Sequence, residues 1–405
     1  MVAKKHGSHS IVAACFMIQA VGVGCFVTYG VFFNSLMEEL HWSRAVISGA
    51  SSSAYFLSGL FAILVGRLSD IYGSRKLMGG AALFFGAGFI LMSQVQEIWQ
   101  LYLFYGLIFG IGLSAVDVIA LTTTARWFSV SRGFMTGIVK VGTGAGQFLL
   151  PFLASILIAS YGWRQAYVLL GAGALVFLFA LAQWLQIEPD RSCQSQPAIV
   201  SRSLDGPPAA ISLTARQAVR SSQMWLLCGS YLLLVFCLLI ILVHIVPHAS
   251  DIGLSPKTAA GVLSTIGAVS MIGRFISGIA IDRIGSKAIL VASILILISA
   301  LLWLRIADCQ WMLYLFASVY GLAHGSFFTA ISPMVAEIFG IAAHGAIFGI
   351  VVFAGTTGGA IGPVIAGKIF DVSGSYAPVF IMITVAACIS LGLTLFLKPA
   401  RLVQN

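Results

Sequence analysis

Four ionisable residues, Asp117, Lys140, Arg274 and His324, lie deep within apolar stretches of this 405-residue chain. A charged side chain at the centre of a membrane-spanning helix costs about 2.5–3.5 kcal/mol on insertion scales, so such residues usually face a wet cavity or a partner and serve a function. Buried cations can bind an anion, and a carboxyl group or an imidazole can carry a proton. These four residues therefore predict a path for an anionic substrate and a proton.

Arg274 is the strongest candidate for a substrate-binding residue. Its neighbours at helical spacing are Ser270, Ser277 and Gly278, which form a small, polar stripe that suits a cavity wall. A guanidinium group can donate two parallel hydrogen bonds to one carboxylate. We predict that Arg274 binds a substrate carboxylate. The alternative is a structural arginine held by backbone carbonyls or by an acid.

Lys140 shares one helical face with Thr136, Thr143 and Gln147. It could bind the same substrate anion as the arginine, as a second cation. It could equally be neutralised by Asp117, because the two residues lie on consecutive, antiparallel segments. The sequence leaves both interpretations open.

Asp117 and His324 are the two candidates for a residue that carries a proton. Burial favours the neutral, protonated form of a carboxyl group, and histidine changes its charge near neutral pH. His324 is also a possible donor to the substrate. A second group, His244, His248 and Asp251, is expected near one end of its helix, where it forms either an outer gate or a wet loop.

The sequence offers no pattern for covalent, ATP-driven or metal chemistry. It has no P-loop, and its glycine clusters at 142–146 and 355–359 are expected in mid-helix, where they serve close packing. The seven cysteines are scattered without metal-binding spacing. We therefore expect no cofactor, no metal and no enzyme activity.

The elements that must position these residues are transmembrane helices. The chain is 59% hydrophobic and 9% charged, with a mean hydropathy of +1.01, whereas a soluble domain carries about 25% charged residues. We predict an all-α membrane protein with twelve transmembrane helices. The apolar segments are 11–35, 44–67, 77–96, 99–127, 133–159, 164–187, 222–247, 257–281, 287–307, 311–339, 345–369 and 376–397.

A turn motif occurs twice, at a constant offset of 212 residues. Its two copies consist of Gly66, Asp70, Gly73 and Arg75, and of Gly278, Asp282, Gly285 and Lys287. The same offset relates Pro151 to Pro363 and Gly162 to Gly374. We predict that the first glycine of each motif allows close helix approach, that the aspartate pairs with basic residues or with a helix N-terminus, and that the second glycine makes a sharp turn. Together they would form a cytoplasmic gate.

The repeat divides the chain into two pseudo-symmetric six-helix bundles, 1–187 and 222–405, joined by a polar linker at 188–221. Because six is an even number, both halves enter the membrane from the same side as parallel repeats, with the path between them. A short surface helix is expected near residues 212–220.

The basic residues indicate the orientation. Of the 22 Lys and Arg residues, fifteen lie in segments assigned to the inside and two lie within helices. The five assigned to the outside are Arg44, Arg164, Lys257, Arg305 and Lys368. This bias predicts a multi-pass plasma-membrane protein, in a bacterial inner membrane, with both termini cytoplasmic. We therefore attribute the net charge of +9 to basic residues that face the anionic inner lipid leaflet, and not to nucleic-acid binding.

The duplicated turn resembles the loop signature of the major facilitator superfamily, and the resemblance extends over all twelve segments. Residues 29–36, which read YGVFFNSL, the following Trp42-Ser43-Arg44 and the lone Arg274 are similar to the bacterial monocarboxylate and oxalate/formate branch. The resemblance implies the major facilitator fold and alternating-access transport of small carboxylates, often with protons.

Two departures from related patterns bear on the substrate. Oxalate/formate antiporters have a lysine in helix eleven, where residues 352–357 have none, and this difference argues against oxalate exchange. Eukaryotic monocarboxylate transporters have an aspartate four residues before the arginine, where this chain has Ser270. The leading hypothesis is a monomeric, proton-coupled transporter of lactate- or pyruvate-like monocarboxylates. The alternative is an exchanger of dicarboxylates or related organic anions.

Overall fold

The computed structural model describes residues 2–129, 131–185 and 212–398, and these residues contain helices and connecting turns. The first half contains α1 (Val2–Leu40), α2 (Arg44–Tyr72), α3 (Ser74–Met92), α4 (Ile98–Leu101), the π-helical η1 (Tyr102–Phe109), α5 (Gly110–Trp127) and α6 (Arg132–Trp184). After the short α7 (Ala215–Arg220), the second half contains α8 (Ser222–Asp251), α9 (Pro256–Ile284), α10 (Ser286–Leu304), α11 (Gln310–Phe339), α12 (His344–Ser373) and α13 (Ala377–Leu395).

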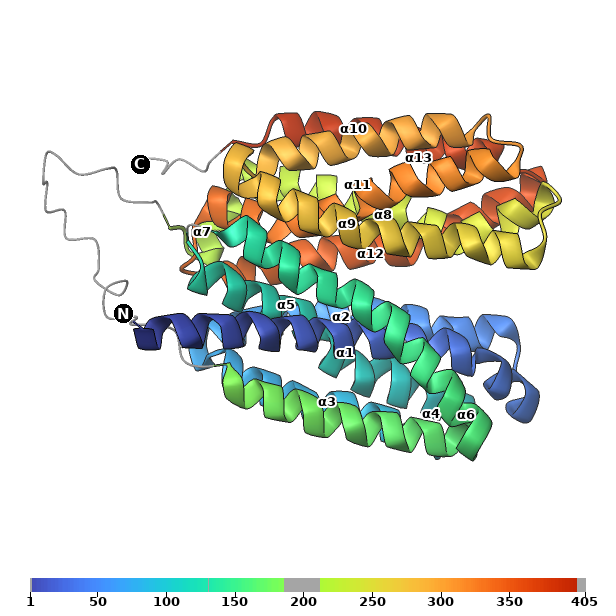
Figure 1. The fold of residues 1–405 in the computed structure, drawn as a ribbon, viewed down its shortest axis with the longest axis horizontal. Coiled ribbons are helices and arrows are strands. Elements are labelled where there is room, and N and C mark those ends of the chain that lie inside the picture. Colours follow the sequence, from blue (N-terminus) through green and yellow to red (C-terminus); the bar gives the residue numbers. More distant parts are fainter. Residues whose placement is uncertain (1, 130, 186–211, 399–405) are drawn as a thin grey trace, which may run out of the picture.

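Eleven continuous helical stretches in the described residues are long and apolar enough to cross a membrane. One of them, α6, has 53 residues and is interrupted at Gly162, which has φ 78° and ψ 162°. The chain reverses direction there, as Figure 1 shows for the green end of α6 beside α3. α6 therefore supplies two spans, and the prediction of twelve transmembrane helices is confirmed.

The two six-helix bundles share turn and capping geometry at the two ends of one pair of equivalent helices. Gly73 and Gly285 end α2 and α9 with φ of 86° and 85°, a backbone conformation that only glycine adopts without strain. Ser43 and Ser255 cap the beginnings of the same two helices by accepting hydrogen bonds from backbone amides. All four residues obey the offset of 212, so the repeat predicted from the sequence is also a structural repeat.

The ends of the helices place the bundles in parallel. α1 begins and α13 ends at the same end of the molecule as α7, on the left in Figure 1. The predicted surface helix is α7, whose N-cap Thr214 forms a capping box with Gln217. Most of the predicted linker, 188–221, lies outside the described residues, which resume at Ser212.

The bundles meet through glycines near the α7 end. A Cβ atom added to Gly66 of α2 would lie 2.0 Å from the carbonyl oxygen of Gly345 in α12. On the other side of the interface, one added to Gly133 of α6 would lie 2.8 Å from the carbonyl oxygen of Gly278 in α9. Only glycine permits such approach, and α2–α12 and α6–α9 thus form the two seams between the bundles. At the opposite end the two bundles diverge in the view of Figure 1.

Candidate functional site

A cavity of about 240 Å³ lies between the bundles and is lined by residues from eight helices. It brings together all four ionisable residues singled out in the sequence: Asp117 from α5, Lys140 from α6, Arg274 from α9 and His324 from α11. The side chains of Lys140, Arg274 and His324 are almost completely buried, with exposed fractions of 4%, 2% and 6%. Each bundle contributes two of the four residues, so any ligand here would contact both bundles.

Asp117 and Lys140 form an ion pair, with 2.5 Å between the lysine Nζ and Asp117 Oδ1. This contact is the one expected if Asp117 neutralises Lys140. The side chain of Asp117 remains 38% exposed toward the cavity. A cation that is buried with its counter-ion keeps its charge without the full cost of desolvation.

Gln19 of α1 completes this pair and was missed in the sequence analysis. Its Nε2 donates to Asp117 Oδ1 at 2.8 Å, and its Oε1 accepts from Thr143 Oγ1 at 2.8 Å and from Lys140 Nζ at 3.4 Å. The amide therefore orients both the acid and the base. The available signal was an amide residue in the middle of an otherwise apolar stretch of the first segment, and the structure shows that Gln19 is fully buried.

Arg274 has no such partner. Its Nε and Nη1 atoms are buried and have no hydrogen-bond partner within the part of the chain that the structure describes. The interpretation of Arg274 as a structural arginine tied to carbonyls or to an acid finds no support in these contacts. With His324 neutral, the charges of Arg274, Lys140 and Asp117 sum to one net positive charge.

His324 lies beside the cations and makes no side-chain hydrogen bond with the described residues. Its Nδ1 is buried and has no partner among the described residues. The imidazole packs against Phe328 with ring centres 5.2 Å apart, and the same Phe328 ring lies 5.8 Å from Lys140 Nζ. A protonated His324 would add a third cation to this group, so the neutral ring fits its surroundings better.

Aromatic side chains of both bundles form much of the remaining wall. Phe26 and Tyr55 come from α1 and α2, and Tyr231 and Phe328 come from α8 and α11. None of these four was singled out from the sequence. An aromatic residue in an apolar helix can face lipid as readily as a cavity, so its type alone gives no signal, whereas a charge does.

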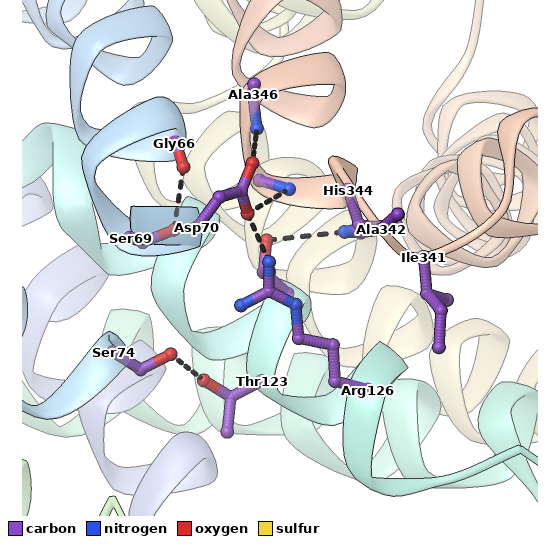
Figure 2. Close-up of polar contacts among 12 residues, drawn as sticks. Gly66, Ser69, Asp70, Ser74, Thr123, Arg126, Ile341, Ala342, His344 and Ala346 are labelled. Carbon is purple, nitrogen blue, oxygen red and sulfur yellow. Dashed lines mark hydrogen bonds and ion pairs between the residues drawn. The ribbon is translucent and has the colours of Figure 1, made fainter. Parts of the chain in front are cut away.

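The first copy of the turn motif connects the bundles at the α7 end. Asp70 of α2 forms an ion pair with Arg126 of α5 and accepts hydrogen bonds from the backbone amides of Gly345 at 3.0 Å and Ala346 at 2.8 Å. Figure 2 shows this carboxylate between the guanidinium group and the first turn of α12. It thus provides a negative charge at the N-terminus of a helix of the other bundle.

The second copy makes the same contact in the opposite direction. Asp282 of α9 accepts hydrogen bonds from the amides of Gly133 at 2.7 Å and Phe134 at 2.9 Å, in the first turn of α6. Each bundle therefore caps a helix of the other at positions related by the offset of 212. The basic residues of the motifs stay within their own bundles: Arg75 donates to Gln183, and Lys287 donates to the carbonyls of Leu395 and Leu397.

The histidines near the end of α8 lie away from the cavity. His244 contacts the hydroxyl group of Tyr376 and the carbonyl of Pro363, each at 3.0 Å. His248 and Asp251 border a separate hollow of about 530 Å³ at the ends of α8, α12 and α13 that lie opposite α7. The structure thus ties His244 into its own bundle instead of placing it at a seam between the bundles.

Comparisons with known proteins agree on the family and the fold. The family model described as Major Facilitator Superfamily matches residues 12–308 and 245–405. Monocarboxylate transporter 12 of Mus musculus is 26% identical over 403 residues, covering 92% of this chain and 81% of that protein. Monocarboxylate transporter 13 of Rattus norvegicus is also 26% identical, over 379 residues, covering 92% of this chain and 84% of that protein.

Solved structures of transporters superpose on nearly the whole chain. The human organic anion transporter MFSD10 is 17% identical with a TM-score of 0.73, covering 95% of this chain and 99% of that one. The transporter FucP in the outward conformation is 16% identical with a TM-score of 0.74, covering 96% of this chain and 98% of that one. At such identities the likeness shows the fold.

Proposed function

This chain belongs to the major facilitator superfamily, and we propose that it transports monocarboxylates together with protons by alternating access. It is a multi-pass membrane transporter and not an enzyme. The observation that carries the proposal is the uncompensated guanidinium group of Arg274 in a cavity between the two bundles. A substrate carboxylate is the partner that such a group lacks.

The net charge of the site favours a substrate with one negative charge. Arg274, Lys140 and Asp117 together carry one positive charge, so a bound monocarboxylate makes the site neutral. A dicarboxylate would leave one negative charge in a cavity of low dielectric, which is costly. Lys140 is already paired and does not supply the second free cation that a dicarboxylate exchanger would need. Simple acids of the lactate and pyruvate type are the smallest substrates that satisfy this balance.

The same charge balance supports coupling to a proton. In the empty site, loss of one proton leaves the Asp117–Lys140 pair with a carboxylate and a neutral amine. The negative charge of the carboxylate then cancels the positive charge of Arg274, and the site is neutral. Binding of one monocarboxylate and return of that proton gives a second neutral state. Neutral forms can be enclosed between the bundles with the least desolvation cost, so substrate and proton would cross together. Asp117 thus belongs to the proton site, and His324 is the competing carrier and a donor to the substrate.

The gate supplies the movement that transport requires. The carboxylates of Asp70 and Asp282 hold the α7 end closed through hydrogen bonds that water can replace. Release of both contacts lets the bundles rock about the central cavity, which is the motion expected of parallel repeats. The names of the monocarboxylate transporter relatives are consistent with this substrate class.

We place the protein in a plasma membrane with the α7 end and both termini in the cytoplasm. The excess of Lys and Arg in the segments assigned to that side supports this orientation. In a bacterial cell, this membrane would be the inner membrane. A monomer is sufficient for the mechanism, because both bundles and the whole cavity belong to one chain.

Substitution of Arg274 tests the proposal. In proteoliposomes with an inward proton gradient, we expect Arg274→Ala to abolish pyruvate uptake, because the carboxylate loses its cation, and Arg274→Lys to retain a small part of it. Near-normal uptake by Arg274→Ala would contradict the mechanism. A counterflow assay distinguishes proton-coupled transport from anion exchange. Uptake that requires an anion on the opposite side of the membrane and does not respond to the proton gradient would indicate exchange.

A further inference from the structure

We propose that the preferred substrates are carboxylates that carry an aromatic ring, joined to the carboxylate by a short chain of carbon atoms. This inference rests on the proposed function and specifies the part of the substrate that Arg274 does not bind. It follows from the walls of the cavity, from its size and from the polar groups in it that have no partner.

Both bundles supply aromatic rings to the cavity. Phe26 and Tyr55 of the first bundle stack with ring centres 5.8 Å apart and an interplanar angle of 28°. Tyr231 of the second bundle stacks on Phe327 at 5.2 Å, and Phe328 completes this side. Flat apolar walls that come from opposite bundles suit a flat apolar group between them, because aromatic rings prefer offset-stacked or edge-to-face contacts.

The size of the cavity leaves room beyond a three-carbon acid. About 240 Å³ is accessible between the bundles, and Val23, Leu113, Leu239 and Val352 add aliphatic surface to the aromatic walls. Lactate or pyruvate bound at Arg274 would leave most of this surface in contact with water. A ring would remove it from water, which is favourable in proportion to the apolar area buried.

Among the hydroxyl groups of the walls, two aromatic ones are uncommitted. Tyr55 and Tyr231 both line the cavity, and their hydroxyl groups make no hydrogen bond with other described residues. The aliphatic hydroxyls of the lining are already used, since Ser58 donates to its own helix and Thr143 donates to Gln19. The two phenols can therefore bind a 2-oxo, 2-hydroxy or ring hydroxyl group of the substrate.

Pyruvate and phenylpyruvate provide a matched pair of probes, because they share the carboxylate and the 2-oxo group and differ by the ring. The experiment uses the full chain in proteoliposomes and measures the half-saturating concentration of each acid under the same proton gradient. We expect the value for phenylpyruvate to be lower by about tenfold or more, since even one methylene group in an apolar pocket changes specificity by about tenfold.

Two variants of Tyr55 locate the effect. Tyr55→Leu removes the ring and should reduce the preference for phenylpyruvate over pyruvate several-fold. Tyr55→Phe retains the ring and should preserve most of that preference. The ratio of the two half-saturating concentrations is independent of how much protein folds, so a lower yield of either variant does not affect the result.

The outcomes separate this inference from the proposed function. If pyruvate is preferred or the two acids are equal, and uptake still depends on Arg274, the aromatic substrate class is wrong and the transport of monocarboxylates stands. If neither acid is transported, or if Arg274→Ala leaves uptake unchanged, both proposals are overturned. A preference for phenylpyruvate that Tyr55→Leu leaves intact would also contradict the assignment of the ring to this wall.

Discussion

At the scale of single residues, the charges of the cavity have unequal environments. Lys140 is held by Asp117 and Gln19, whereas Arg274 has no partner in the described structure. A paired cation needs no substrate to balance it, while an unpaired one does. In the proposed mechanism, this difference gives substrate binding to Arg274 and makes the Asp117–Lys140 pair the site where a proton is gained or lost.

Removal of the ion pair in two steps tests this division of roles. Asp117→Asn leaves the Lys140 cation buried without its counter-ion, and we expect it to lower the free energy of unfolding by about 1–3 kcal/mol and to abolish proton-driven uptake. The double variant Asp117→Asn/Lys140→Met restores one net positive charge. It should recover stability and counterflow of the monocarboxylate but not accumulation driven by a proton gradient.

Thermal unfolding and two transport assays on the same preparations provide the measurement. His324→Gln is the matched control, because it removes the competing proton carrier and leaves the charge of the site unchanged. If the double variant still accumulates the monocarboxylate under a proton gradient and His324→Gln does not, the proton site is His324 and not Asp117.

The sequence revealed the charged residues of the site better than it revealed the walls. Arg274 and Asp117 stood out because charges are rare and costly in apolar helices. Gln19 gave a weaker signal, and Tyr231 gave none. The lining of the cavity depends on which face of each helix turns toward the other bundle. In a helix that is apolar on all faces, the hydrophobic pattern does not show which face this is.

At the scale of helices, the gate depends on the N-terminal turns of α6 and α12. Each turn presents unsatisfied backbone amides and the positive end of a helix dipole, and each is met by an aspartate from the opposite bundle. The duplicated motif predicted both aspartates and both turn glycines. It could not predict the crossing of the contacts between bundles, because that depends on how the two repeats face each other.

Asparagine substitutions at the two aspartates should open the α7 end. A carboxylate in a partly buried position at a helix N-terminus contributes about 1–2 kcal/mol, so Asp282→Asn is expected to shift the equilibrium between closed and open forms by about fivefold to thirtyfold. Asp70→Asn is expected to give a shift of similar size, because the ion pair of Asp70 with Arg126 lies within the first bundle and does not connect the two bundles.

Labelling of a cysteine at Thr136 measures this opening. Thr136 is fully buried on α6 between the gate and Lys140, so a cysteine there reacts with a reagent added on the α7 side only when that end opens. Arg75→Gln is the control, because Arg75 binds Gln183 within its own bundle and should leave the rate unchanged. Equal labelling rates in the parent and both asparagine variants would show that these contacts do not hold the gate.

At the scale of the whole molecule, orientation in the membrane can be tested with a native thiol. Cys309 precedes α11 and is partly exposed at the end opposite α7. We expect a membrane-impermeant maleimide to label it in intact cells and expect the label to disappear in Cys309→Ser. Cys193 belongs to the predicted cytoplasmic linker. Labelling that persists in Cys309→Ser and disappears in Cys193→Ser would show the opposite orientation.

The crosswise contacts of Asp70 and Asp282 have the form of a homodimer interface. In a symmetric dimer, residue i of one subunit meets residue j of the other, and j meets i, so one sequence specifies the interface twice. A six-helix ancestor that paired with a second copy of itself would have closed its α7 end with one kind of contact, made twice. Fusion of the copies would then have freed each half to differ, and the site shows the result: the counterpart of Arg274 is Ala62, and that of Lys140 is Val352.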